Sequence, residues 1–441
     1  MIHTDNPAAR ALGYASVIRK RVAKRLRRRL AIDWPRTLRA LTRGEQESVQ
    51  RALAWTLAAN TRTISNDGWN REVIKHLIHR AAGHIDHYTA TTRIHDLSTC
   101  AQPSRLTVRG WLELEHVAGA VGLFAASAGF RNQAFRRIEH AAAKSDRWLV
   151  ASILALLYER DVEAAQSRWK VLTAKVGHTA AHHREPQLGR YLRLLQGTGE
   201  PDPRRHYRSD AYKEWLQAVA NRRVMIYGPA PTSGYQASAL NTGPVARFMA
   251  PGITEWAATD DYARGRTDIV YINLATLRWL KTLTPSQRTA LLAHYQTVIF
   301  KNSSIHWRTW GLKNARQAYA SASLLLRGFA NQVPVACWDT LQAPGTSLFV
   351  LGATFYASHD EYRASEARPS MSRRSSREVA DQRFQRCASI ATHNPTQNRA
   401  LIANLVECGL VSGDAEFSEV VGLSDADYLK RLDSIYGYAG R

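Results

Sequence analysis

Residues 223 to 234 read Arg-Val-Met-Ile-Tyr-Gly-Pro-Ala-Pro-Thr-Ser-Gly. The four apolar residues from Val224 to Tyr227 form a short β-prone run that ends at Gly228. This pattern predicts a buried strand that enters a tight loop. After the first strand of a parallel sheet, such a loop lets backbone N–H groups approach a phosphate closely. The spacing matches neither Gly-x-Gly-x-x-Gly nor a P-loop with its Lys, so a plain strand-to-helix turn remains the alternative.

Strands and helices alternate outward from this stretch. We expect strands at 224–227, 245–249, 268–272, 297–300, 333–338 and 347–351, and helices at 209–220, 285–295 and 312–328. Strands rich in Val, Ile and Phe that alternate with helices predict an α/β fold with a Rossmann-like, mostly parallel sheet covered on both faces. Ligands of such sheets bind at the carboxyl ends of the strands, where the loop after Gly228 would lie.

The first half of the chain has helical periodicity. Apolar residues recur at three- and four-residue spacing over 38–60, 70–83, 107–126, 131–144, 147–159, 162–175 and 186–195. Two similar helical hairpins resemble tetratricopeptide packing, although a solenoid needs three or more. A Gly- and Pro-rich linker near 197 marks a boundary. We therefore predict a basic amphipathic helix within 1–33, an α-helical domain over 34–200 and an α/β domain over 201–441.

The charge balance is strongly basic, because 441 residues carry a net charge of +23 with a sequence pI near 10.2. An acidic partner is expected: an anionic membrane surface, nucleic acid or a phosphate-bearing substrate. Residues 17–30 place eight Lys or Arg around an apolar stripe. This helix either docks on the following domain or contacts an anionic membrane. Nucleic acid is the least favoured partner, because few aromatic residues are interleaved.

Cysteine and histidine do not indicate a metal or a disulfide framework. The four Cys, at 100, 337, 387 and 408, show no Cys-x-x-Cys spacing. No secretory signal follows Met1, and the apolar run 117–130 is shorter than the roughly 20 residues of a spanning helix. We expect a cytoplasmic protein, or one peripheral to the inner face of the membrane. The His residues form two polar patches, expected to hold no metal: His76, His79, His84 and His87, and His178, His182 and His183 in a solvated loop.

Two His residues follow elements of the predicted sheet domain. After the strand 347–351, the chain places Tyr356, His359 and Tyr362 where the carboxyl end of a strand would meet a ligand. A polar, basic segment over 365–377 then predicts either a lid or a mobile surface loop. His393 precedes Pro395, a natural first-turn residue, so it lies just before a helix. There an imidazole can face a pocket and act as a general base, or simply cap the helix.

These stretches resemble a known family of enzymes. Ile-Tyr-Gly-Pro-Ala-Pro-Thr-Ser-Gly, followed by Val-Ala-Arg-Phe-Met-Ala-Pro-Gly and Gly-Arg-Thr-Asp-Ile-Val-Tyr-Ile-Asn, resembles the large sialyl motif of sialyltransferases. Leu-Phe-Val-Leu-Gly-Ala-Thr-Phe-Tyr resembles the strand of their small motif, His359 with Tyr362 resembles the third motif, and His393 opens a stretch similar to the very small motif. The resemblance covers roughly residues 222 to 436.

The resemblance implies a bacterial sialyltransferase-like enzyme of glycan biosynthesis. It would transfer a sugar acid, of the sialic acid or Kdo type, from a CMP-activated donor with inversion and without a metal cofactor. The resemblance assigns His393 as the general base and His359 as the residue that assists the departing phosphate. The nucleotide and substrate contacts would come from Gly228, Pro229, Ala230, Thr232, Ser233, Gly234, Arg247, Asn273, Tyr356 and Tyr362. Because Pro229 lacks an N–H, the backbone donors would be the non-proline residues of the loop.

The sequence also departs from the family pattern. Phe248 and Met249 follow Arg247 where the family has an Asn, and Gln397 or Asn398 stands where the family has a Glu. The Ser-Thr-Gly of the small motif has no clean equivalent. These departures leave open a related transferase that uses CMP-Kdo. They also leave open a non-catalytic helical-repeat adaptor with a degenerate nucleotide-binding domain.

Overall fold

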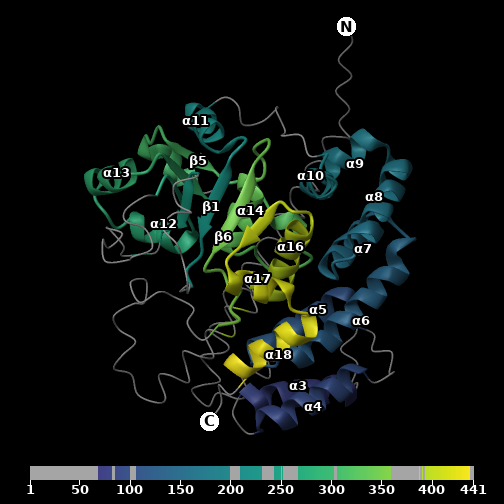
Figure 1. Cartoon of the computed structure of the whole chain (residues 1–441). Helices are drawn as coiled ribbons and strands as arrows, with labels where there is room; N and C mark the ends of the chain where they lie inside the picture. Colours follow the sequence, from purple (N-terminus) through teal and green to yellow (C-terminus); the bar gives the residue numbers. More distant parts are fainter. Residues whose placement is uncertain are drawn as a thin grey trace, which may run out of the picture. The chain divides into compact units, whose positions relative to one another are not determined.

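The structure is a computed structural model (Figure 1). It describes residues 68–81, 85–99, 106–198, 209–230, 243–249, 251, 267–301, 305–358, 387, 390 and 393–437. The chain divides into two compact units: unit 1 comprises Met1–Arg131, Ser376–Ser389 and Gly437–Arg441, and unit 2 comprises Asn132–Ser375 and Ile390–Tyr436. The helices predicted at 17–30 and 38–60 and the segment 365–377 lie outside the described residues.

Unit 1 is helical in its described part. It contains α3 (Gly68–Ala81), α4 (His87–Thr99), α5 (Val108–Ala120) and the beginning of α6 (Phe124–Ala142). Trp111 is at the centre of an aromatic cluster, with ring centroids 5.4 Å from Trp69 and 6.1 Å from Phe130. The sequence did not predict α4, because only small or widely spaced residues, Ala90, Ile94 and Ser98, form its buried face.

Four helices from the segment predicted as the α-helical domain lie in unit 2 together with the sheet. They are α7 (Asp146–Tyr158), α8 (Val162–Val176), α9 (His178–Arg184) and α10 (Pro186–Leu195). Hydrogen bonds tie them to α16 (Pro395–Glu407): Asn404 Nδ2 donates to Leu157 O at 2.9 Å and Tyr191 Oη donates to Leu401 O at 2.7 Å. The division between units therefore falls inside α6 and does not coincide with the predicted boundary at residue 200.

The segment from His178 to Arg184 corrects one prediction, because it is a helix and not a solvated loop. His182 lies against the Trp169 ring, with centroids 5.2 Å apart, and its Nε2 lies 3.1 Å from that of His178. Burial, Arg193 and His178 lower the pKa of His182 to about 4. The His182 imidazole is therefore packed and uncharged, in a segment that the sequence predicted as a polar loop.

Unit 2 is built on a seven-stranded sheet in which every pairing is parallel. The strands are β1 (Arg223–Tyr227), β2 (Val245–Phe248), β3 (Ile269–Ile272), β4 (Thr297–Phe300), β5 (Ala315–Gln317), β6 (Ser347–Leu351) and β7 (Val411–Gly413). Their order is β5-β4-β3-β2-β1-β6-β7. All residues of β2, β3 and β4 are buried, as expected for a parallel sheet covered on both faces. The predicted α/β, Rossmann-like fold is confirmed.

The strand order places a topological switch point between β1 and β6. Strands β1 to β5 extend in one direction from β1, whereas β6 returns to its other side and pairs through Val224 with Leu348 and through Ile226 with Val350. In open α/β sheets, ligands bind outside the carboxyl ends of the strands at such a point. The ends of β1 and β6 therefore mark the first place to look for a functional site.

Short helices join and follow the strands. They are α11 (Asp210–Val219), α12 (Leu274–Leu280), α13 (Pro285–Ala293), η2 (Ile305–Trp310), η3 (Ala322–Leu324), α14 (Gln332–Thr340), α17 (Ala415–Gly422) and α18 (Asp425–Tyr436). A capping box starts α13: Thr284 accepts from the Gln287 backbone N–H and the Gln287 side chain accepts from the Thr284 backbone N–H. The predicted helices at 209–220 and 285–295 are confirmed, with ends that differ by one or two residues.

Two predicted elements of the sheet domain are wrong. Residues 312–328 were predicted as a helix, but they contain β5 and the short 3-10 helix η3. Residues 333–338 were predicted as a strand, but they form α14, in which Val333 to Thr340 are all buried. A short apolar run does not distinguish a buried helix from a buried strand, and a helix surrounded by protein lacks a polar face.

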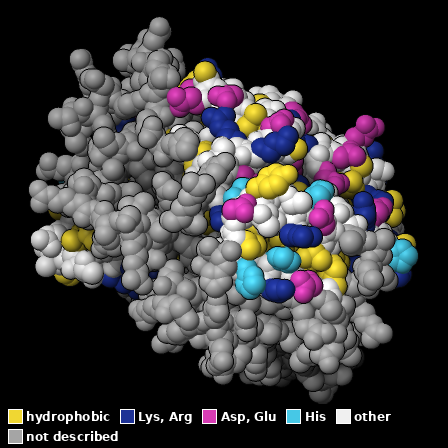
Figure 2. Space-filling model, turned by 90° about the horizontal axis from the view of Figure 1, so that it is seen from below, with side chains coloured by type: hydrophobic (Ala, Val, Ile, Leu, Met, Phe, Trp, Pro, Cys, Tyr) yellow, Lys and Arg dark blue, Asp and Glu magenta, His cyan; other side chains and the backbone are white. Residues whose placement is uncertain are grey.

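The described side chains on one face of the molecule do not concentrate one charge sign (Figure 2). On the face in Figure 2, the coloured basic, acidic and His side chains lie interspersed with apolar ones. Some of the described charges pair, as where Lys75 Nζ lies 3.9 Å from Glu72 Oε1 and Lys175 Nζ lies 3.0 Å from Asp146 Oδ1. The visible face is therefore not a continuous basic patch. Among the helices that the structure describes, none has the length and apolar character needed to cross a bilayer.

Candidate functional site at the carboxyl edge of the sheet

The loops that follow β1 and β6 are hydrogen-bonded to each other. Gly228 N donates to Leu351 O at 2.6 Å, and Ala230 N donates to Gly352 O at 2.9 Å. This corrects the prediction that both N–H groups donate to a nucleotide, because they already bind carbonyls of the neighbouring loop. Pro229 between them has no N–H. The other predicted donors, Thr232, Ser233 and Gly234, lie outside the described residues.

The glycine at residue 228 is required by this close approach. A Cβ at Gly228 would lie 2.2 Å from Gly352 O and 2.7 Å from its carbonyl carbon. Both are backbone atoms, so the two loops would have to separate. We expect Gly228→Ala to destabilise the protein by roughly 1–3 kcal/mol, the usual range for overpacking. Urea denaturation measures this, and Gly422→Ala, which meets no atom within 4 Å, is the control. Equal midpoints for the two variants would contradict the packing argument.

Asn273 and Arg247 have structural contacts in the described structure. Asn273 follows β3, and its side chain caps α12 by accepting from Thr276 N at 2.9 Å. Arg247 is buried in β2, and its guanidinium lies 4.8 Å from the centroid of the Tyr227 ring. Arg247 lies in the carboxyl-terminal half of β2. Asn273 lies just beyond the end of β3, as predicted. Two further predicted residues, His359 and Tyr362, lie outside the described residues.

The His393 ring contacts the backbone of Phe329. Its Nδ1 lies 3.3 Å from Phe329 O. A carbonyl oxygen only accepts, so Nδ1 carries the hydrogen, and in the neutral ring Nε2 is an acceptor. Burial and the nearby Lys301 charge lower the pKa of His393 to about 4. At neutral pH the ring is therefore uncharged, with one nitrogen able to accept a proton.

Lys301 approaches the same segment from the sheet. It directly follows β4, its backbone N donates to Ile272 O at 2.9 Å, and its Nζ donates to Ala330 O. Burial lowers the pKa of Lys301 to about 8. Sequence reasoning missed this residue, although its position was a usable signal: a basic residue immediately after a buried strand lies at the edge where ligands bind.

Asn398 and Tyr356 complete the contacts around residues 329 to 331. Asn398 Oδ1 accepts from Asn331 N at 2.7 Å, and its Nδ2 donates to the carbonyls of His393 and Asn394. Tyr356 Oη donates to Asn331 Oδ1 at 3.2 Å. The structure thus brings together two predicted residues, His393 and Tyr356, around a segment that lies between two predicted elements.

The loop that carries Tyr356 is conformationally strained. Phe355 and Tyr356 have φ values of +47° and +71°, a region that bulky side chains rarely adopt. Two hydroxyls restrain this backbone, since Tyr428 Oη donates to Phe355 O and Tyr436 Oη donates to Tyr356 O at 2.9 Å. Strain of this kind persists where surrounding contacts over-determine it, and it clusters at functional sites.

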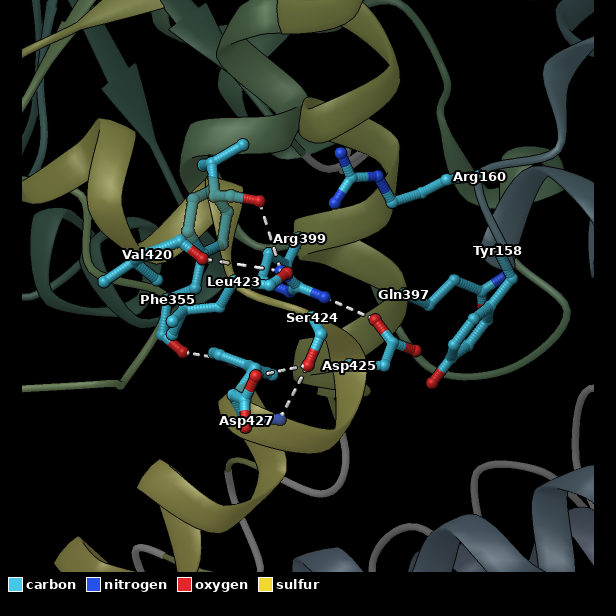
Figure 3. A network of polar contacts seen from close by, with 12 residues as sticks. Tyr158, Arg160, Phe355, Gln397, Arg399, Val420, Leu423, Ser424, Asp425 and Asp427 are labelled. Atoms are coloured by element: carbon cyan, nitrogen blue, oxygen red, sulfur yellow. Dashed lines mark hydrogen bonds and ion pairs between the residues drawn. The ribbon is translucent and has the colours of Figure 1, made fainter.

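A network of polar contacts around Arg399 supports these restraints (Figure 3). Arg399 of α16 is fully buried, and its Nη1 donates to the carbonyls of Val421, at 3.2 Å, and Leu423 at the end of α17. Its Nη2 pairs with Asp425 at the start of α18, which carries Tyr428. Arg399 therefore joins α16, which begins after His393, to the helix that restrains Phe355.

The described side chains do not form a metal centre. No group of three or more His, Cys, Asp or Glu in the described part of the chain is arranged to hold a metal ion. In the His-rich patch around His79, α3 ends at Ala81 and a new helix begins at His87, so a helix end falls inside the cluster.

Comparison of the chain with protein-family models, with curated proteins and with solved structures gives no significant match. The resemblance to sialyltransferases thus remains a prediction from sequence motifs. The functional argument rests on the geometry at the carboxyl edge.

Proposed function

We propose that this protein is an inverting, metal-independent glycosyltransferase that moves a sugar acid of the sialic acid or Kdo type from a CMP-activated donor to a glycan hydroxyl. The observation that supports this most directly is the state of His393. Its ring is neutral, Nδ1 is occupied by Phe329 O, and Nε2 is the acceptor at the edge where parallel sheets bind ligands.

In the proposed reaction, His393 Nε2 accepts the proton of the acceptor hydroxyl while that oxygen attacks the anomeric carbon. The bond between the anomeric carbon and the phosphate oxygen of CMP breaks, and CMP leaves with the electron pair. A base with a pKa near 4 is weak, but a bound phosphate would neutralise the Lys301 charge that contributes to the low pKa of His393. Donor binding would therefore raise the pKa of the base when it is needed.

Saturation-transfer NMR with CMP, UMP and AMP tests the nucleotide assignment. We expect signals for CMP that exceed those for the other two. Incubation with CMP-N-acetylneuraminate and CMP-Kdo, followed by detection of released CMP, then tests donor use. If none of the three nucleotides binds, the transferase proposal fails and the helical adaptor becomes the better explanation.

The pH dependence of donor turnover follows from the sign of the His393 shift. A lowered pKa means that the unprotonated, basic form predominates from about pH 5 upward. In the free enzyme, kcat/KM should rise through about pH 4 and show no inflection near 6.5, where an unperturbed His titrates. Initial rates in overlapping buffers measure the profile, with circular dichroism as a control for acid unfolding. An inflection near 6.5 would show that His393 is exposed and unperturbed.

A further inference from the structure

Among the residues that the structure describes, Lys301 places a positive charge at the site with no carboxylate paired to it. No carboxylate in the described part of the chain lies within ion-pair distance of its ammonium, and its one described side-chain hydrogen bond is to Ala330 O. The neighbouring His393 is neutral at pH 7. A partly buried cation is costly unless it is paired, so this position favours an anionic ligand.

The backbone leaves Lys301 little freedom to move away. Its N–H continues the β3–β4 pairing through Ile272 O, and its side chain ends on Ala330 O. An ammonium has three hydrogens, so two remain after the bond to Ala330. Its lowered pKa, about 8, still leaves it mostly protonated at pH 7. Lys301 therefore offers two charged donors at the carboxyl end of β4.

The exposed ring of Phe329 adds an apolar surface beside these donors. Phe329 is 57% exposed, although its carbonyl binds His393 and the next carbonyl binds Lys301. An aromatic ring at this position offers apolar area against which a ligand ring can pack. The segment from Phe329 to Ala330 thus combines an apolar ring with the carbonyls that orient a base and a cation.

We propose that Lys301 binds the phosphate of the nucleotide and stabilises its negative charge as the nucleotide departs. This inference rests on the proposed function. Lys301 is not part of the sequence motifs that resemble those of sialyltransferases. Charge that develops on the phosphate oxygen would be met by a fixed donor in a site of low dielectric constant. The same anion would supply a counter-charge that no described side chain gives to Lys301.

Binding of CMP, cytidine and inorganic phosphate to the full-length chain tests the proposal by isothermal titration calorimetry. Removing a hydrogen bond to a charged group usually weakens binding by about 10- to 100-fold. We expect Lys301→Met to weaken CMP binding by that factor and to leave cytidine binding unchanged. Lys301→Arg keeps the charge and should bind CMP within a few-fold of the wild type. Lys313→Met, an exposed lysine before β5, is the matched control.

A labelling experiment gives a second readout that does not need turnover. An amine-reactive reagent at pH 8, followed by peptide mass spectrometry, should label Lys301, and CMP or phosphate should protect it while cytidine does not. Unchanged CMP affinity in Lys301→Met, or equal loss of cytidine and CMP, would overturn the phosphate assignment. If CMP protects Lys301 and no CMP-sugar is turned over, the phosphate site stands and the transferase proposal fails. If Lys301→Met leaves donor turnover unchanged, the phosphate assignment fails and the transferase proposal stands.

Discussion

Asp339→Asn is expected to lower the free energy of unfolding by about 3–5 kcal/mol, because it leaves a buried guanidinium without its counter-charge. Arg316 Nη1 lies 3.1 Å from Asp339 Oδ1 and Nη2 lies 2.5 Å from Oδ2, and the side chains are 5% and 0% exposed. Asp339 also accepts from Tyr319 N at 2.7 Å and from Tyr271 Oη at 2.8 Å. An amide cannot accept all four of these donors.

This ion pair also joins the sheet to the site. Arg316 lies on β5, and Asp339 lies on α14, whose first residue directly follows the segment Phe329 to Asn331. The Arg316 guanidinium stacks 3.7 Å from the Trp215 ring centroid, so tryptophan fluorescence should report the loss of packing. We therefore expect the variant to lose order at the 329–331 segment at lower urea concentrations than the wild type.

The matched control changes the same residue type at the surface. Lys213 Nζ lies 3.4 Å from Asp210 Oδ1, and the Asp210 side chain is 86% exposed. Exposed pairs contribute little, so Asp210→Asn should leave the urea midpoint unchanged within error. If both variants unfold at the same midpoint as the wild type, the Arg316–Asp339 pair does not stabilise the fold as argued.

His393→Ala is expected to lower donor turnover by about 10²- to 10⁴-fold, the usual contribution of a general base. CMP affinity should change little, because the proposed phosphate contact is made by Lys301 and not by the imidazole. The measurement is released CMP under single-turnover conditions, together with calorimetric binding of CMP. The variant should also lose the rise in rate through about pH 4 that the lowered pKa of His393 predicts.

The control for this variant is a His residue that lies away from the carboxyl edge. His294 is exposed at the end of α13, so His294→Ala should retain wild-type turnover. A His393→Ala variant that binds CMP and turns over donor normally would remove His393 from the mechanism. Loss of CMP binding together with turnover would instead assign His393 a positioning role for the segment Phe329 to Asn331.

Several elements were predictable because their signals are local. The strand at 297–300 has the predicted bounds, and the helix after Pro395 begins where a first-turn proline places it. Residues 333–338 were misread because β-branched residues also occur in helices that are buried on all sides. The strand at 315–317 was hidden because its stability comes from pairing with β4 and from the bond between Arg316 and Asp339.

The candidate site was predictable only in part. His393 and Tyr356 could be selected because each follows or precedes a recognisable element at the carboxyl edge. Asn398 could not, since its role is to bind Asn331, a residue 67 positions away in sequence. Gly228 was singled out correctly as a position of close approach, but the partner is Gly352 and the predicted phosphate donors at Gly228 and Ala230 are occupied.

By itself, the sequence determined the strands β1, β2, β3, β4 and β6, the glycines that follow β1 and β6, and that a His stands just before the helix at residue 395. These properties depend on neighbours within one or two turns of the chain. Only the tertiary structure decided the order β5-β4-β3-β2-β1-β6-β7 and the convergence of Lys301, Tyr356 and His393 on the segment Phe329 to Asn331. Both arise from contacts between residues far apart in sequence, which local pattern does not encode.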